Sequence, residues 1–132
     1  MKRYGNSAVL VCSVLIWIGI ALPQESKFDE GERYFKERNY SKAIGVFKEI
    51  LDRPGWDEIS YKSALRLGQC YLALDDYENA RQFFNVASEG KEEIAVEARI
   101  GIAVSYIGEK NYDAAIDTLS EVIIQYMEDK LL

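Results

Sequence analysis

The residues of this chain that could take part in catalysis are mainly carboxylates, because the sequence contains no histidine and only two cysteines. Histidine is the commonest general base and metal ligand near neutral pH, so its absence removes the usual routes to acid–base and metal chemistry. Adjacent carboxylates occur at Asp57-Glu58, Asp75-Asp76, Glu92-Glu93 and Glu128-Asp129. Each pair is expected at a helix end or in a turn, where acidic side chains cap backbone amides or face the helix dipole, and not in a buried cleft. The sequence therefore predicts no enzyme activity and no cofactor or metal site.

The cysteines and the overall charge argue against two further classes of function. Cys70 adjoins Tyr71 and Leu72 in an expected amphipathic helix, where a buried thiol behaves as a small, unreactive hydrophobe. Cys12 lies in an apolar run, and Val11 before it is larger than a lipidation signal prefers. The chain carries 16 basic and 22 acidic residues, a net charge of −6. Nucleic acid binding needs clustered basic residues, so an acidic chain is not expected to have that function. The buried position expected for Cys70 likewise predicts no reactive thiol.

The N-terminus has the layout of an export signal. Lys2 and Arg3 precede an uncharged apolar run, Ala8 to Leu22, which is shorter than the about 20 residues that span a bilayer. The triplet Gly19-Ile20-Ala21 offers a cleavage site after a small residue. We expect residues 1–22 to be a signal peptide cleaved near Ala21, or alternatively an uncleaved membrane anchor with its basic end in the cytoplasm. Both interpretations predict an exported protein, soluble in a bacterial periplasm or held at the inner membrane.

Behind this segment, small and aromatic residues recur in columns. The columns are Gly31, Gly68 and Ala103; Tyr34, Tyr71 and Tyr106; Tyr40, Tyr77 and Tyr112; Ala43, Ala80 and Ala115; and Phe47, Phe84 and Leu119. Within each unit their spacing predicts two amphipathic helices joined by a short turn. Small residues let the paired helices approach closely, and Tyr supplies a large apolar body with a polar tip. Asn39, Asp76 and Asn111 precede the second helix of each unit and are expected to cap it.

With these columns the chain resembles the tetratricopeptide repeat family, whose helix-turn-helix unit has nominally 34 residues. The resemblance implies an all-α solenoid, a right-handed superhelix of three repeats behind an N-terminal apolar helix. Residues 24–128 would hold the repeats, at about 24–54, 57–90 and 92–128. The linker around Pro54 and Trp56 is longer than the family standard. We therefore expect looser or twisted stacking of the first unit on the second, with Trp56 either filling the junction or exposed as a contact residue.

The same resemblance implies that the first helix of each unit lines a concave inner face. Independently of the family, one set of residues lies opposite the Gly/Tyr packing stripe of these helices. The set is Phe28, Glu32, Phe35, Lys36, Lys62, Leu65, Gln69, Leu72, Glu97, Ile100, Val104 and Ile107. An apolar face of this kind usually marks an interaction site. We expect a non-catalytic scaffold or adaptor of the cell envelope that binds an apolar helix or peptide in this groove.

Self-association is the alternative function. Ile116, Leu119, Ile123 and Tyr126 form an apolar stripe on the last expected helix, and no polar closing helix follows it. Repeat arrays generally need a polar outer face at each end. The open stripe therefore predicts a docked partner, a homo-oligomer or a truncated array.

Overall fold

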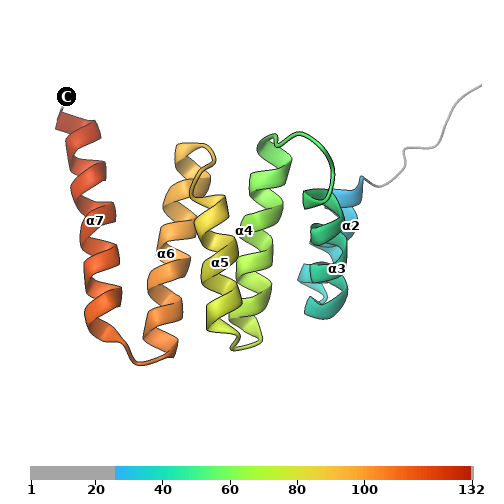
Figure 1. Ribbon diagram of the computed structural model, residues 1–132, viewed down its shortest axis with the longest axis horizontal. Coiled ribbons are helices and arrows are strands. Elements are labelled where there is room, and N and C mark those ends of the chain that lie inside the picture. Colours follow the sequence, from blue (N-terminus) through green and yellow to red (C-terminus); the bar gives the residue numbers. More distant parts are fainter. Residues whose placement is uncertain (1–25, 132) are drawn as a thin grey trace, which may run out of the picture.

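The computed structural model describes residues 26–131, which form six α-helices arranged as three antiparallel pairs in a row (Figure 1). The helices are α2 (Lys27–Lys36), α3 (Tyr40–Leu51), α4 (Glu58–Ala73), α5 (Tyr77–Ala87), α6 (Glu92–Gly108) and α7 (Tyr112–Leu131). Each helix packs against the next one along the chain. The predicted all-α array of three helix pairs is therefore confirmed.

The turn inside each pair has the same backbone design in all three units. One residue adopts a left-handed conformation: Arg38 (φ 58°), Asp75 (φ 57°) and Lys110 (φ 63°). The following residue donates its backbone N–H to a carbonyl in the Tyr column, through bonds of 2.8–2.9 Å from Asn39 to Tyr34, Asp76 to Tyr71 and Asn111 to Tyr106. This is the hydrogen-bond pattern of a Schellman motif, which satisfies the free carbonyls at a helix end.

The residue that closes the first helix also begins the second. The side chains of Asn39, Asp76 and Asn111 accept hydrogen bonds from the backbone N–H groups three residues later. The capping predicted for these three positions is confirmed. One short polar residue thus serves two helix ends, which explains why the turn can be so short.

Glycine provides the close contact inside the first two pairs. A Cβ atom added at Gly31 would lie 2.5 Å from the Phe47 ring, and one added at Gly68 would lie 2.5 Å from the Phe84 ring. Gly101 on α6 approaches the tip of the Phe84 ring, also with 2.5 Å to an added Cβ. Phe84 is only 1% exposed, so it is clamped between α4 and α6. The predicted role of the small-residue column in close helix packing is confirmed at Gly31 and Gly68.

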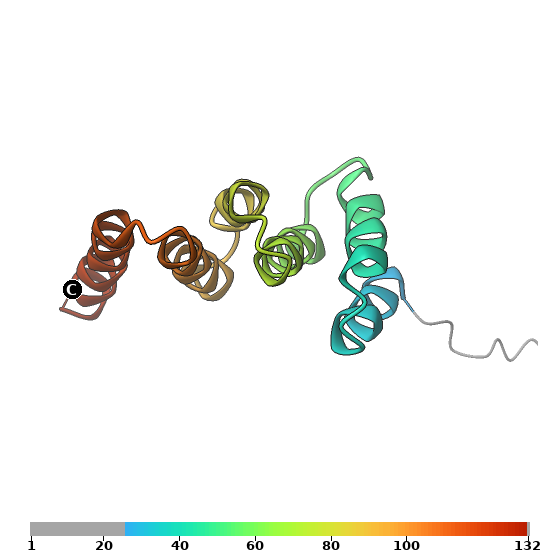
Figure 2. The same ribbon diagram turned by 90° about the horizontal axis from the view of Figure 1, so that it is seen from below.

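The junction between the first and second pairs differs from the junction between the second and third. Residues 52–57 connect α3 to α4, whereas the shorter segment 88–91 connects α5 to α6. Gly55 in the longer segment has a φ of +85°. In Figure 2, α4 to α7 are seen nearly along their axes, whereas α3 is seen from its side. The first pair is therefore turned relative to the others, and α2 touches α4 less extensively than α4 touches α6.

Trp56 lies at this junction without being buried in it. Its side chain is 48% exposed, and its ring contacts Tyr61 with 5.6 Å between the ring centroids. Of the two interpretations of Trp56, the structure thus favours the exposed one.

The predicted signal peptide or anchor, residues 1–22, lies outside the described residues. Among the helices from α2 to α7, none has the combination of length and apolar character required to span a membrane.

Candidate functional site

The first helices of the three pairs form a continuous layer. α2 contacts α4 and α4 contacts α6, whereas α3, α5 and α7 do not contact one another. This layer is the face on which the sequence places the candidate binding residues. The structure hollows it where α2, α4 and α6 come together.

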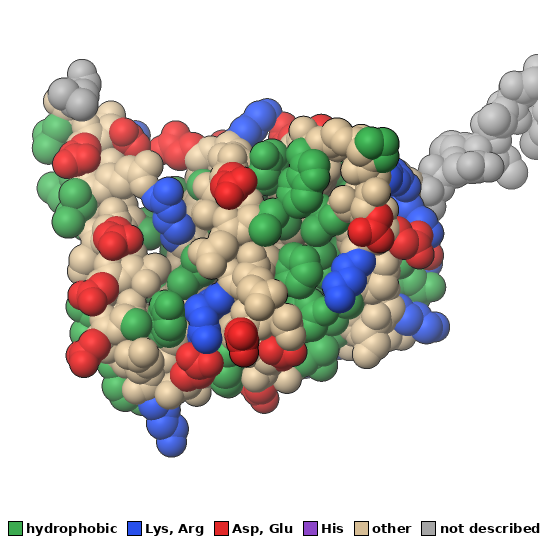
Figure 3. Space-filling model, in the orientation of Figure 1, with side chains coloured by type: hydrophobic (Ala, Val, Ile, Leu, Met, Phe, Trp, Pro, Cys, Tyr) green, Lys and Arg blue, Asp and Glu red, His purple; other side chains and the backbone are tan. Residues whose placement is uncertain are grey.

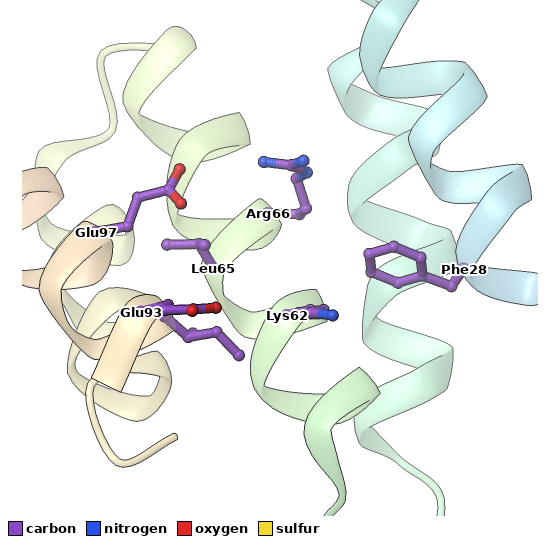
Figure 4. Close-up of a pocket in the computed structure, with 7 residues that line it drawn as sticks. Phe28, Lys62, Leu65, Arg66, Glu93 and Glu97 are labelled. Carbon is purple, nitrogen blue, oxygen red and sulfur yellow. The ribbon is translucent and has the colours of Figure 1, made fainter. Parts of the chain in front are cut away.

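A hollow of about 340 Å³ lies across α4, between α2 and α6. It is lined by Phe28, Lys62, Leu65, Arg66, Glu93, Ile94 and Glu97. Figure 4 shows Phe28 on α2 to one side, Lys62 and Arg66 on α4, and Glu93 and Glu97 on α6 to the other side. Phe28, Lys62, Leu65 and Glu97 belong to the set predicted from the sequence. The α2 side of the hollow is therefore apolar, the α4 side carries two basic groups and the α6 side carries two carboxylates.

A hydrogen-bond network beside the hollow joins all three first helices. The Arg66 guanidinium donates to both carboxylate oxygens of Glu32 on α2, and to the Gln69 side-chain oxygen at 2.7 Å. Gln69 in turn donates to the Glu97 carboxylate on α6 at 2.8 Å. Arg66 also lies over the Phe35 ring, 5.2 Å from its centroid. The network holds Glu32, Gln69 and Glu97, three predicted residues, in fixed positions relative to one another.

Arg66 is the central residue of this network, and it was not among the predicted residues. It lies four residues after Lys62 and three before Gln69, a spacing that puts all three on one helix face. That spacing was a usable signal. The bidentate pairing with Glu32 depends on the position of α2, which the sequence pattern does not give.

A second charged cluster lies at the N-terminal end of α4. Glu58 pairs with Lys62 at 2.7 Å and also with Lys91, which comes just before α6. The Lys62 ammonium and then the Lys91 ammonium lower the pKa of Glu58 to about 2. The Lys62 charge at the rim of the hollow is thus held by a neighbour on its own helix.

The apolar members of the predicted set are covered to different degrees. Leu65 is 5% exposed and packs in a core cluster with Ile94 and Ala98. Phe28 packs against Phe47, with 5.7 Å between ring centroids. Phe35 and Leu72 are half-buried. Lys36, in the last turn of α2, is exposed.

On α6 the predicted apolar residues stay exposed. Ile100, Val104 and Ile107 are each between 41% and 47% exposed. The apolar residues of α4 are more buried than those of α6 because α4 is flanked by α2 on one side and α6 on the other. Within residues 26–131 no helix follows α6 in this layer. The apolar part of the face is therefore concentrated toward its C-terminal end.

The outer face, formed by the second helices, also carries apolar side chains. Figure 3 shows hydrophobic side chains gathered over α4, between α3 and α5. Between α4 and α5 the rings of Tyr71 and Phe83 stack in parallel with 5.5 Å between centroids, and the ammonium of Lys48 on α3 lies within 5.9 Å of both centroids. This stack joins α4 to α5 and was not predicted as a surface feature.

The groups that could do covalent chemistry lie elsewhere in the fold. Cys70 is buried, and burial raises the pKa of its thiol to about 12, which keeps it protonated. Asp57 and Asp76 accept backbone hydrogen bonds as helix caps. Across residues 26–131 no group of three metal-ligating side chains comes together. The hollow itself offers ion pairing, hydrogen bonding and apolar contact.

Comparison with known proteins gives a family. A tetratricopeptide repeat model matches residues 28–93, half of the chain, and a second tetratricopeptide repeat model matches residues 97–126. A search of curated proteins and of solved structures found no match. The matched segments cover the three helix pairs with their shared turns and close glycine contacts. The chain belongs to the tetratricopeptide repeat family.

Proposed function

We propose that this protein is a non-catalytic scaffold or adaptor that binds a segment of another protein on the face formed by α2, α4 and α6. Tetratricopeptide repeats generally mediate binding between proteins. The observation that carries the proposal is the hollow of about 340 Å³ next to the network of Glu32, Arg66, Gln69 and Glu97. The network pre-orders the polar groups, so less side-chain entropy is lost when a ligand binds.

The expected ligand is an apolar helix or an extended peptide. One large apolar side chain of the ligand would enter the hollow against Phe28 and Leu65. The charged rim, with Lys62 and Arg66 facing Glu93 and Glu97, would fix the direction of the bound chain. A hollow of this size is at the lower end of the ~300–1,000 Å³ typical of pockets for small molecules, and it is open to solvent, which favours a side-chain anchor over an enclosed ligand.

We further propose that the protein acts in a bacterial cell envelope. The support is the N-terminal sequence, in which Lys2 and Arg3 precede an apolar run with a possible cleavage site at Ala21. N-terminal sequencing of the protein from its own cells tests this proposal. A start just after Ala21 indicates cleavage, whereas a start at Met1 rules cleavage out and leaves the anchor to be tested by membrane fractionation.

Site-specific photo-crosslinking in the native cell tests the binding face. A photoreactive amino acid at position 62, on the rim of the hollow, should trap one defined partner, whereas the same group at position 78 on the exposed surface of α5 should not. Equal products from Lys62 and Glu78 would contradict the proposed face. A product of twice the mass of the chain at position 62 would instead support self-association, the competing function.

A further inference from the structure

The third helix pair leaves a strip of large apolar side chains exposed, separate from the hollow. On α7, Ile116 is 60% and Ile123 is 58% exposed, and on α6 Ile100 and Ile107 are also exposed. We call these four residues, together with the exposed Met127, the end strip. The seven-residue spacing within each helix places its two isoleucines on one line.

The two halves of the end strip lie on the same side of the α6–α7 pair. Arg99 donates a hydrogen bond to Gln125 and so marks one edge of the contact between these helices. Gln125 is nine residues from Ile116, which is half a turn around the helix at 100° per residue, so Ile116 lies at the opposite edge. Ile107 and Ile116 are both near the turn that joins the antiparallel helices, and Ile100 and Ile123 are both about two turns farther away. The end strip thus runs along one side of the α6–α7 pair.

Negative charge is concentrated in the same helix pair. Residues 92–131 carry nine acidic and three basic side chains, a net charge of −6, whereas residues 26–91 carry twelve acidic and eleven basic ones, a net charge of −1. Acidic residues adjoin the end strip on both helices, with Glu93 in line with Ile100 on α6 and Asp113 and Asp117 beside Ile116 on α7. Figure 3 shows acidic side chains along the length of α7.

We propose that the end strip is a second docking site, and that it binds an amphipathic helix whose apolar stripe is flanked by lysine or arginine. A groove between two antiparallel helices accepts a third helix through apolar anchors spaced three, four and seven residues apart. The acidic rim then selects for basic flanks, because opposite charges attract across the interface and like charges are rejected. This inference deepens the proposed function and rests on it, because Ile100 and Ile107 belong to the α6 part of the proposed face and Glu93 lines the hollow, whereas Ile116 and Ile123 extend the site onto α7.

The charge distribution also argues against a second copy of this chain as the occupant. An end-to-end pair of copies would bring two helix pairs of net charge −6 into contact. A head-to-tail contact would place α2 of one copy on the end strip of the next, but the exposed residues of α2 are Asp29, Arg33 and Lys36, which are all charged. Neither arrangement offers an apolar stripe with basic flanks.

Peptide binding by the full-length chain tests the proposal. The probe is a fluorescent synthetic helix of about 18 residues with a leucine stripe and lysine flanks, compared with the same helix carrying glutamate flanks. Fluorescence anisotropy should show that the lysine helix binds at least about tenfold more tightly than the glutamate helix, and that its binding weakens as salt rises.

Variants locate the site. The double variant Ile116→Ser/Ile123→Ser should weaken binding of the lysine helix about tenfold or more, whereas Leu74→Ser, at a leucine that is 49% exposed in the turn after α4, should leave it unchanged. Circular dichroism should show unchanged helicity in both, because the replaced side chains are exposed. Equal affinity for both peptides, no binding of either, or unchanged binding by the double variant would overturn the proposal. So would sedimentation of the chain as a dimer that the double variant dissociates, because the occupant would then be a second copy.

Discussion

Replacing Gly68 with alanine is expected to destabilise the protein, whereas the same replacement at Gly45 is expected to stabilise it. Both glycines lie inside helices, Gly68 in α4 and Gly45 in α3. They differ in their surroundings. A Cβ added at Gly68 would lie 2.5 Å from the Phe84 ring, whereas one added at Gly45 would have no neighbour within 4 Å.

The magnitudes follow from two opposing effects. Alanine is favoured over glycine in a helix interior by about 0.8–1 kcal/mol, and this gain applies at both positions. Overpacking a core contact costs about 1–3 kcal/mol, and this loss applies only at Gly68. The upper end is expected, because Gly101 on α6 closely contacts the tip of the same Phe84 ring and restricts its movement away from Gly68. Gly68→Ala should therefore lower the free energy of unfolding by about 2 kcal/mol, and Gly45→Ala should raise it by about 1 kcal/mol.

Urea unfolding followed by circular dichroism at the helix band measures both changes, from the shift of the midpoint at constant slope. A third variant makes the cause explicit. Phe84→Leu removes the ring edge, so the double variant with Gly68→Ala should be more stable than the two single losses combined predict. If Gly68→Ala raised the midpoint as Gly45→Ala does, or if Gly68 and Phe84 showed no coupling, the reasoning about close helix approach would be refuted.

Three further predictions concern single groups. The Lys62 and Lys91 ammonium groups hold the pKa of Glu58 near 2, so the stability from this carboxylate is present above its ordinary pKa of 4.5 and is lost as the pH falls from 4.5 toward 2. The variant Glu58→Gln should therefore show a smaller change of the thermal unfolding midpoint with pH in this range. An unchanged pH profile would count against these ion pairs. Because burial raises the pKa of the Cys70 thiol to about 12, iodoacetamide should label this residue only after unfolding, as measured by peptide mass spectrometry. Rapid labelling of the native protein would show that the thiol is accessible. Lys110→Gly should raise the urea midpoint by an amount equivalent to about 0.5–1 kcal/mol, because glycine adopts the left-handed backbone at φ 63° without the steric strain that a lysine has there. A lower midpoint would mean that the lysine side chain stabilises the turn.

Much of the fold could be predicted because its determinants are local. The helix pairs follow from apolar spacing, and the turns follow from a polar residue that ends one helix and caps the next, as Asn39 and Asp76 do. Close helix approach follows from glycine opposite a phenylalanine, as at Gly68 and Phe84. Each of these signals depends on the type of one or two residues at fixed separations.

The candidate site could be predicted only in part, because its properties depend on how helices from different units meet. Spacing places Leu65 and Ile100 on the same face, yet Leu65 is buried by α6 and Ile100 remains exposed. The network likewise requires Glu32 on α2 to meet Arg66 and Glu97 on α6 to meet Gln69. Sequence periodicity gives the direction of a side chain from its own helix, and it does not give what the neighbouring helix puts opposite.

The irregular junction between the first two pairs explains where the hollow forms. Where α4 and α6 pack closely, Leu65 and Ile94 meet in the core. At the first junction the long connection 52–57 turns α2 away from α4, so Phe28 stands beside the inner face instead of closing over Leu65. A second hollow of about 340 Å³ opens at the same junction and is lined by Phe28 together with the residues of the connection. Shortening this connection to the length of segment 88–91 would therefore be expected to draw α2 onto α4 and fill the hollow, which links the departure from the regular repeat directly to the proposed binding site.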